Sequence, residues 1–142
     1  MNRGKWLTVG ILAAGVFLAG CGTAAESAPE KPAEVQSIQG TSLNRVVLTE
    51  RAVERTGIKT AATQQLSTGL AVPLVAVVYL SDGSAWVYTV TAPRTYVRQS
   101  VSIARVAGDT AILQTGPAPG TSVVTTGAAE LLGSEYGVAG GQ

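Results

Sequence analysis

Hydrophobic and polar positions alternate along much of the chain after residue 43. In residues 95–103, for example, Val97, Val101 and Ile103 share one face of an extended segment. The other face carries mostly polar side chains, namely Tyr96, Arg98, Ser100 and Ser102. Val, Thr and Tyr are frequent throughout this region, and glycine-containing turns separate the apolar runs. The pattern predicts a mostly β domain over residues 43–133, a small antiparallel β-roll or barrel-like fold of about seven strands.

One short helix is expected after the first of these strands. Thr49 is a suitable N-cap, and Glu50 favours the positive N-terminal end of a helix. Residues 50–56 are helical in composition, and Gly57 follows where a helix commonly ends. A strand is expected to resume at Ile58.

The first 20 residues have a different pattern. Arg3 and Lys5 make a basic start, and residues 6–19 then form an apolar run of 14 residues. A helix that spans a membrane needs about 20 apolar residues, so this run is short for a permanent anchor. Residues 1–20 are therefore predicted to be a signal peptide.

The signal ends in Leu18-Ala19-Gly20-Cys21, which resembles the lipobox of bacterial lipoproteins. The resemblance implies that the Cys21 thiol receives a diacylglyceryl group, that the signal is removed, and that Cys21 becomes the acylated N-terminus. The protein would then be a lipid-anchored membrane protein that faces the periplasm or the cell exterior. A plain secreted protein, or a short membrane helix that contains a cysteine, is the alternative. The sequence does not indicate which membrane or envelope type is involved.

Small residues, prolines and glutamates dominate the segment after Cys21. Such a composition does not bury a core, so residues 21–42 are predicted to be a flexible, lipidated tether. Residues 134–142 are rich in glycine and are expected to form a flexible tail.

Composition excludes several kinds of chemistry. The chain of 142 residues has no histidine and one cysteine, which removes histidine-based catalysis and the usual zinc sites. Its net charge is +1, so no basic field favours a nucleic acid. Without Arg3 and Lys5 the mature chain has 8 basic and 9 acidic residues. We expect no enzymatic activity, no cofactor and no metal.

Several segments follow one another in a familiar order. Val72-Pro73, Asp82-Gly83, Trp86-Val87-Tyr88 and Arg98-Gln99-Ser100-Val101 are followed by Gly108-Asp109-Thr110 and by a closing stretch from Gly120 to Leu132. The set resembles the C-terminal region of periplasmic adaptor subunits, the membrane fusion proteins (HlyD-like, RND-type) of efflux pumps. The resemblance spans residues 46–132 and implies the fold of the adaptor membrane-proximal domain, with a transporter permease subunit as partner.

The departures from the family pattern are as informative as the matches. Residues 47–49 and 56–60 resemble the segment by which some adaptors enter this domain. Adaptors carry several hundred residues between that entry segment and the one that matches Val72-Pro73, whereas residues 61–69 bridge the interval here. No helical heptads of the family's α-hairpin occur, and Pro117 replaces a usual leucine. The chain resembles an adaptor reduced to its lipid anchor and membrane-proximal domain.

These observations predict a lipid-anchored, non-enzymatic accessory protein of an efflux or export transporter. Arg94, Arg98 and Arg105 are the candidate partner-docking residues, because arginine favours interfaces. Solvent-facing charge on an otherwise apolar strand is the alternative for each of them. Trp86 and Tyr88 are expected to fill the core or to lie across one face of the sheet. An envelope lipoprotein that binds a ligand, peptidoglycan or a secreted protein is the alternative function, and these two rings would then form a platform on which a sugar or peptide stacks. A remnant of a decayed adaptor is a third interpretation, and the oligomeric state is left open.

Overall fold

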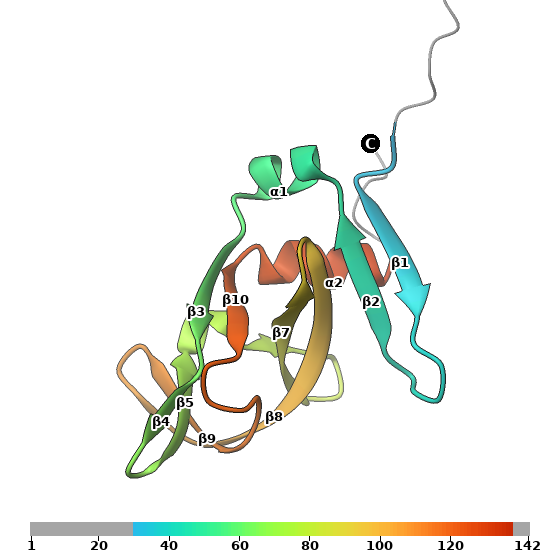
Figure 1. Cartoon of the computed structure of the whole chain (residues 1–142). Helices are drawn as coiled ribbons and strands as arrows, with labels where there is room; N and C mark the ends of the chain where they lie inside the picture. The colour runs from blue at the N-terminus through green and yellow to red at the C-terminus, as the bar shows by residue number, and fades with distance from the viewer. Residues whose placement is uncertain (1–29, 138–142) are drawn as a thin grey trace, which may run out of the picture.

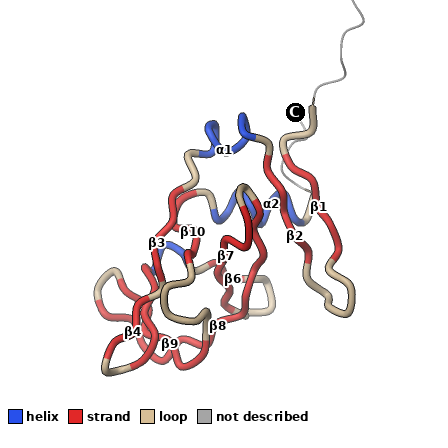
Figure 2. Tube along the Cα trace, viewed as in Figure 1, coloured by secondary structure: helices blue, strands red, loops and turns tan. Residues whose placement is uncertain are grey.

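The computed structural model describes residues 30–137, which form ten strands, two α-helices and one 3-10 helix. Strands make up most of the elements, as Figures 1 and 2 show. In chain order the elements are β1 (Ala33–Ser37), β2 (Asn44–Leu48), α1 (Glu50–Thr56), β3 (Lys59–Ala62), β4 (Gln64–Leu66), β5 (Gly69–Pro73), η1 (Leu74–Ala76), β6 (Val78–Tyr79), β7 (Ala85–Ala92), β8 (Thr95–Ala107), β9 (Thr110–Thr115), β10 (Ser122–Thr126) and α2 (Ala128–Glu135).

The strands form one antiparallel sheet that curls into a nearly closed barrel. Seven strands follow the order β3-β10-β7-β8-β9-β5-β4, and each pairs with its neighbour in antiparallel register. The β1–β2 hairpin joins this sheet through β2 and β8, and β6 pairs with β7. The predicted mostly β, barrel-like fold of about seven strands is therefore confirmed.

Two hydrophobic clusters lie on opposite faces of the sheet. Tyr88 and Val124 belong to the cluster that packs against α2, whereas Val87 and Val123 belong to the cluster inside the curled sheet. Neighbouring residues fall into different clusters because successive side chains of a strand point to opposite faces. All four are fully buried. The sheet is thus covered on both sides, and α2 supplies part of the cover.

Helix α1 has the predicted boundaries and caps. The Oγ1 atom of Thr49 accepts a hydrogen bond of 3.2 Å from the amide of Ala52, and Gly57 adopts a left-handed φ of 59°. The N-cap satisfies an amide that has no partner within the helix, and glycine adopts the left-handed conformation without steric cost. The strand predicted to resume after Gly57 is β3.

The segment predicted to be a tether contains a strand. Strand β1 pairs with β2 over five residues, from Ala33 opposite Leu48 to Ser37 opposite Asn44. Pairing with β2 gives hydrogen-bond partners to the backbone N–H and C=O groups of β1, a segment with few buried side chains. Ala33 also packs against the hydrophobic cluster that contains Tyr88 and Val124. The prediction of a flexible segment was therefore wrong for residues 33–37.

The C-terminal region also differs from the prediction. One helix was expected, but α2 forms a second one and continues through Ser134 to Glu135, into the segment predicted to be a flexible tail. Leu131 is 1 % exposed, and Glu135 is buried as well. The helix contains Gly133, which lowers its intrinsic helix propensity. It is therefore stabilised mainly by packing against the sheet.

The remaining predictions for the two ends lie outside the described residues. They are the signal peptide, the lipobox with Cys21, the tether as far as residue 29, and residues 138–142 of the tail. Among residues 30–137, no helix has the length and apolar character needed to cross a membrane.

Candidate functional site

The three candidate docking arginines do not form one surface. Arg94 lies in the turn just before β8, Arg98 lies within the strand, and Arg105 lies near its far end. An extended chain rises about 3.3 Å per residue, so Arg94 and Arg105 are separated by roughly 36 Å of chain. Each of the three therefore needs a separate explanation.

Arg98 is buried beneath aromatic rings and helix α2. Its side chain is 9 % exposed, and Nε lies 3.1 Å from Oε1 of Glu135. One terminal nitrogen donates a 2.9 Å hydrogen bond to the hydroxyl of Tyr136. The guanidinium also lies over two rings, 4.7 Å from the centre of Trp86 and 5.3 Å from that of Tyr136. The prediction of Arg98 as a docking residue was wrong, because these contacts already occupy its charge and its faces.

Glu135 connects the end of α2 to three strands. Its Oε2 accepts a 2.6 Å hydrogen bond from the hydroxyl of Tyr88 on β7, and its Oε1 accepts a longer one of 3.5 Å from Asn44 on β2. Arg98 on β8 supplies the opposite charge. The Arg98 Nε makes no hydrogen bond within the described part of the chain, so its contact with Glu135 is an ion pair without an aligned N–H. We call Asn44, Tyr88, Arg98 and Glu135 the α2 clamp.

Burial, reinforced by the hydrogen bond to the Glu135 carboxylate, raises the pKa of Tyr88 well above its usual value near 10. The unfolded chain therefore loses this proton first as the pH rises. The stability that the neutral Tyr88 phenol contributes to the folded chain is therefore complete below about pH 10. Above that pH the free energy of unfolding falls by up to about 1.4 kcal/mol per pH unit.

We expect Tyr88→Phe to reduce the alkaline loss of unfolding free energy, as measured by urea denaturation between pH 8 and pH 11. Burial also raises the pKa of Tyr96, so part of the slope should remain. Tyr79 is 58 % exposed, and Tyr79→Phe serves as the matched control with an unchanged slope. An unchanged slope in Tyr88→Phe would mean that the clamp does not hold the neutral phenol.

Tyr88 lies in the core as expected, and the alternative, a stacking platform made by Trp86 and Tyr88, is largely absent. Tyr88 is fully buried, so it offers no ring to a ligand. Trp86 is half-buried, donates a 2.7 Å hydrogen bond from Nε1 to Ser84, and has the Arg98 guanidinium over its ring. The two rings that suggested a ligand-binding surface instead belong to the support of α2.

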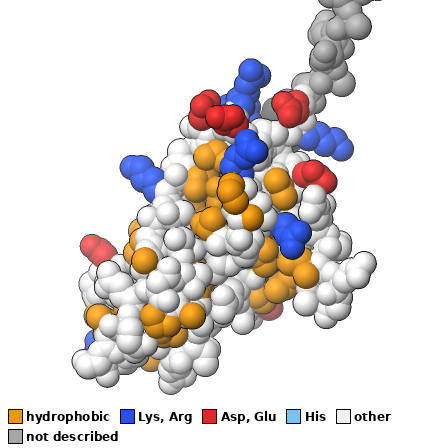
Figure 3. Space-filling model, viewed as in Figure 1, with side chains coloured by type: hydrophobic (Ala, Val, Ile, Leu, Met, Phe, Trp, Pro, Cys, Tyr) orange, Lys and Arg blue, Asp and Glu red, His pale blue; other side chains and the backbone are white. Residues whose placement is uncertain are grey.

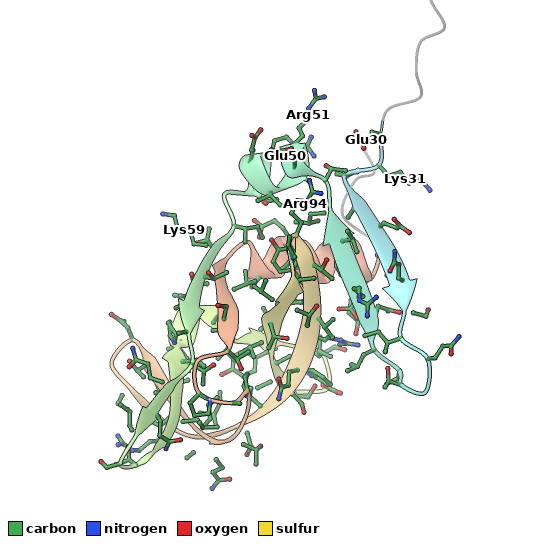
Figure 4. The ribbon with its side chains drawn as sticks, viewed as in Figure 1. Glu30, Lys31, Glu50, Arg51, Lys59 and Arg94 are labelled. Carbon is green, nitrogen blue, oxygen red and sulfur yellow. The ribbon has the colours of Figure 1, made fainter. Side chains whose placement is uncertain are left out.

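Arg94 lies in a different environment, at the end of the molecule that carries α1. It is exposed and lines an open groove of about 1410 Å³, together with Lys31 before β1 and Arg51 on α1. Figure 4 shows these three side chains around the end from which the described chain begins. Their charges are interleaved with those of Glu30 and Glu50, which line the same groove. Figure 3 shows this gathering of basic and acidic side chains.

The turn that carries Arg94 is bound to the strand beside it. The carbonyl of Arg94 accepts a 2.9 Å hydrogen bond from the amide of Leu48, the last residue of β2. Arg94 itself has a φ of 57°, in the left-handed region. The backbone therefore holds Arg94 at the rim of the groove. Lys31 and Arg51 were not predicted, because only the folded chain brings them to the same groove.

Arg105 is exposed near the end of β8 that lies away from α1. Within residues 30–137 the ion pair of Arg98 with Glu135 is the only one, so neither Arg94 nor Arg105 is paired with a described carboxylate. No group of three acidic, histidine or cysteine side chains with metal-site geometry occurs in the described part of the chain.

Asp82 serves the turn between β6 and β7. Its Oδ1 accepts hydrogen bonds from the amide and the hydroxyl of Ser84, at 2.8 and 2.6 Å. These bonds lower the pKa of the Asp82 carboxyl. The side chain therefore stabilises a local turn, as expected for an aspartate in that position.

No protein-family model, curated protein or solved structure matches the chain.

Proposed function

We propose that the protein is a lipid-anchored, non-enzymatic accessory of a transmembrane efflux or export transporter, adaptor-like and facing away from the cytoplasm. The observation that carries the proposal is the continuity of the domain: residues 46–132, which carry the resemblance to adaptors, run from β2 to α2 without a break in the fold. The order of segments that suggested an adaptor membrane-proximal domain is therefore compatible with one β domain.

The place where adaptors carry their additional domains supports the same interpretation. Here β3 and β5 are connected by β4 and a short turn, which form the β4–β5 hairpin. The hairpin lies at the end of the molecule opposite α1 and the start of the described chain (Figure 1). A short link can thus replace a long insertion at this position and leave the sheet intact.

The position of the first described residue supports a location close to the anchor. Glu30 lies nine residues after Cys21, which corresponds to a reach of at most about 30 Å. A lipid on Cys21 would therefore keep the start of the domain within about 30 Å of the membrane surface. It would also raise the effective concentration for a weak contact with a membrane protein, so a small docking surface is sufficient.

Affinity purification from solubilised membranes tests the proposed partner. The full chain with a C-terminal tag, cross-linked in cells before solubilisation, is expected to recover a polytopic transporter subunit. Cys21→Ser should recover less of it, because the effective concentration at the membrane is lost. Recovery of the protein alone, or with peptidoglycan in place of a transporter, would contradict the proposal, and the second result would favour the ligand-binding alternative.

A further inference from the structure

The backbone of Arg94 is unusual for its residue type. Among residues 30–137, Arg94 is the one non-glycine residue with a positive φ, at 57°. Pro93 precedes it, and in a turn of this kind the position after proline is usually glycine or asparagine. A side chain other than these is strained there, and the Arg94 side chain is exposed, so the fold gains no buried contact in return. Binding of the guanidinium to a group outside the domain would account for this strained backbone.

The groove beside Arg94 offers charges of both signs. Lys31, Arg51 and Arg94 contribute three cations, and none of them forms an ion pair with another described residue. Their side chains project from separate elements around the same end of the molecule, as Figure 4 shows.

The same groove is lined by carboxylates and therefore has no excess of positive charge. The acidic side chains that line it are Glu30, Glu34, Glu50 and Glu54. A purely anionic surface would be attracted by the cations and repelled by these four groups. A ligand that presents phosphate and ammonium groups side by side matches both sets.

The chain outside the structure indicates where such a ligand would come from. Glu30 lines the groove and is also the first described residue, so the nine-residue connection to Cys21 starts at this site. Whatever surface holds Cys21 is within about 30 Å of the groove. The far end of the molecule, with the β4–β5 hairpin, has no such connection.

We propose that this groove contacts the headgroups of zwitterionic phospholipids, with Arg94, Arg51 and Lys31 on the phosphates and the neighbouring carboxylates on the ammonium groups. The contact orients the domain with α1 towards the membrane. The inference rests on the proposed function, because it requires the lipid on Cys21 to bring the domain to that surface.

Photo-cross-linking tests this contact on the acylated full chain in phosphatidylethanolamine vesicles that contain a headgroup-photoreactive analogue. Peptides from α1 and from the turn at Arg94 are expected to carry the label. Arg94→Asn should lower the labelling about fivefold without lowering the melting temperature, because asparagine tolerates the left-handed conformation. Arg105→Asn, at the far end of β8, is the matched control and should leave the labelling unchanged.

Replacing part of the phosphatidylethanolamine with phosphatidylglycerol separates two kinds of lipid surface. Equal labelling on both vesicles, with little dependence on salt, supports recognition of mixed charges. A strong preference for the anionic vesicles, equal labelling of wild type and Arg94→Asn, or labelling centred on the β4–β5 hairpin would overturn the inference. If instead the purified protein carries no lipid on Cys21 and does not associate with vesicles, the proposed function itself fails.

Discussion

Arg98→Ala is expected to lower the free energy of unfolding by about 3–5 kcal/mol, a large part of the stability of a domain of this size. The substitution removes the charge opposite Glu135, whose side chain is 1 % exposed, and leaves the carboxylate buried without its cation. It also removes the group that lies over the rings of Trp86 and Tyr136. Because Glu135 is the last residue of α2, the loss should loosen the cover over one face of the sheet.

Urea denaturation followed by circular dichroism measures this effect, and the design contains its own controls. Arg105→Ala changes an exposed arginine on the same strand and should cost less than about 0.5 kcal/mol. The double variant Arg98→Met, Glu135→Leu removes both charges and should recover much of the lost stability, since paired apolar side chains replace a buried ion pair at little cost. Equal, small effects of Arg98→Ala and Arg105→Ala would show that the clamp contributes nothing to stability.

Cys21→Ser is expected to abolish stable, lipid-dependent attachment to the membrane. Serine has no thiol to carry the diacylglyceryl group, and each buried CH₂ of an acyl chain contributes roughly 0.8 kcal/mol to anchoring. We expect the variant either to leave the membrane fraction or to remain there with its signal uncleaved. Immunoblots of carbonate-washed membranes distinguish the two, because the uncleaved form is 20 residues longer.

Arg105→Asn serves as the control for this experiment, because it changes an exposed arginine of β8 and leaves both the groove and the lipobox intact. Its membrane fraction and its processing should equal those of the wild type. Normal processing and an undiminished membrane fraction in Cys21→Ser would be incompatible with the lipobox interpretation.

The strands and α1 could be predicted because their signals are local. Alternation from Thr95 onwards identified β8, and Thr49 with Gly57 marked both ends of α1. Strand β1 and helix α2 were missed for the opposite reason. The sequence of β1 is mostly polar, and this strand forms because it pairs with β2. The sequence of α2 is rich in small residues, and this helix forms because Leu131 is buried against the sheet. No local pattern reveals either contact.

The docking residues show the same limit at the level of single side chains. The alternation of β8 placed Arg98 on the same face as Ser100 and Ser102, and an arginine among serines suggests solvent. That face is covered at Arg98 by the end of α2, 37 positions further along the chain. The groove residues Lys31, Arg51 and Arg94 are likewise separated in sequence, so only the fold brings them to one hollow.

The adaptor-like role and the headgroup contact both depend on a lipid at Cys21, and the intact mass of the protein extracted from membranes tests this most directly. We predict a chain that begins at Cys21, without residues 1–20, and that carries the added mass of a diacylglyceryl group. Tandem fragmentation should locate that mass on the first residue. A chain that retains Met1, or one that begins at Cys21 or later with no added mass, would contradict the proposal.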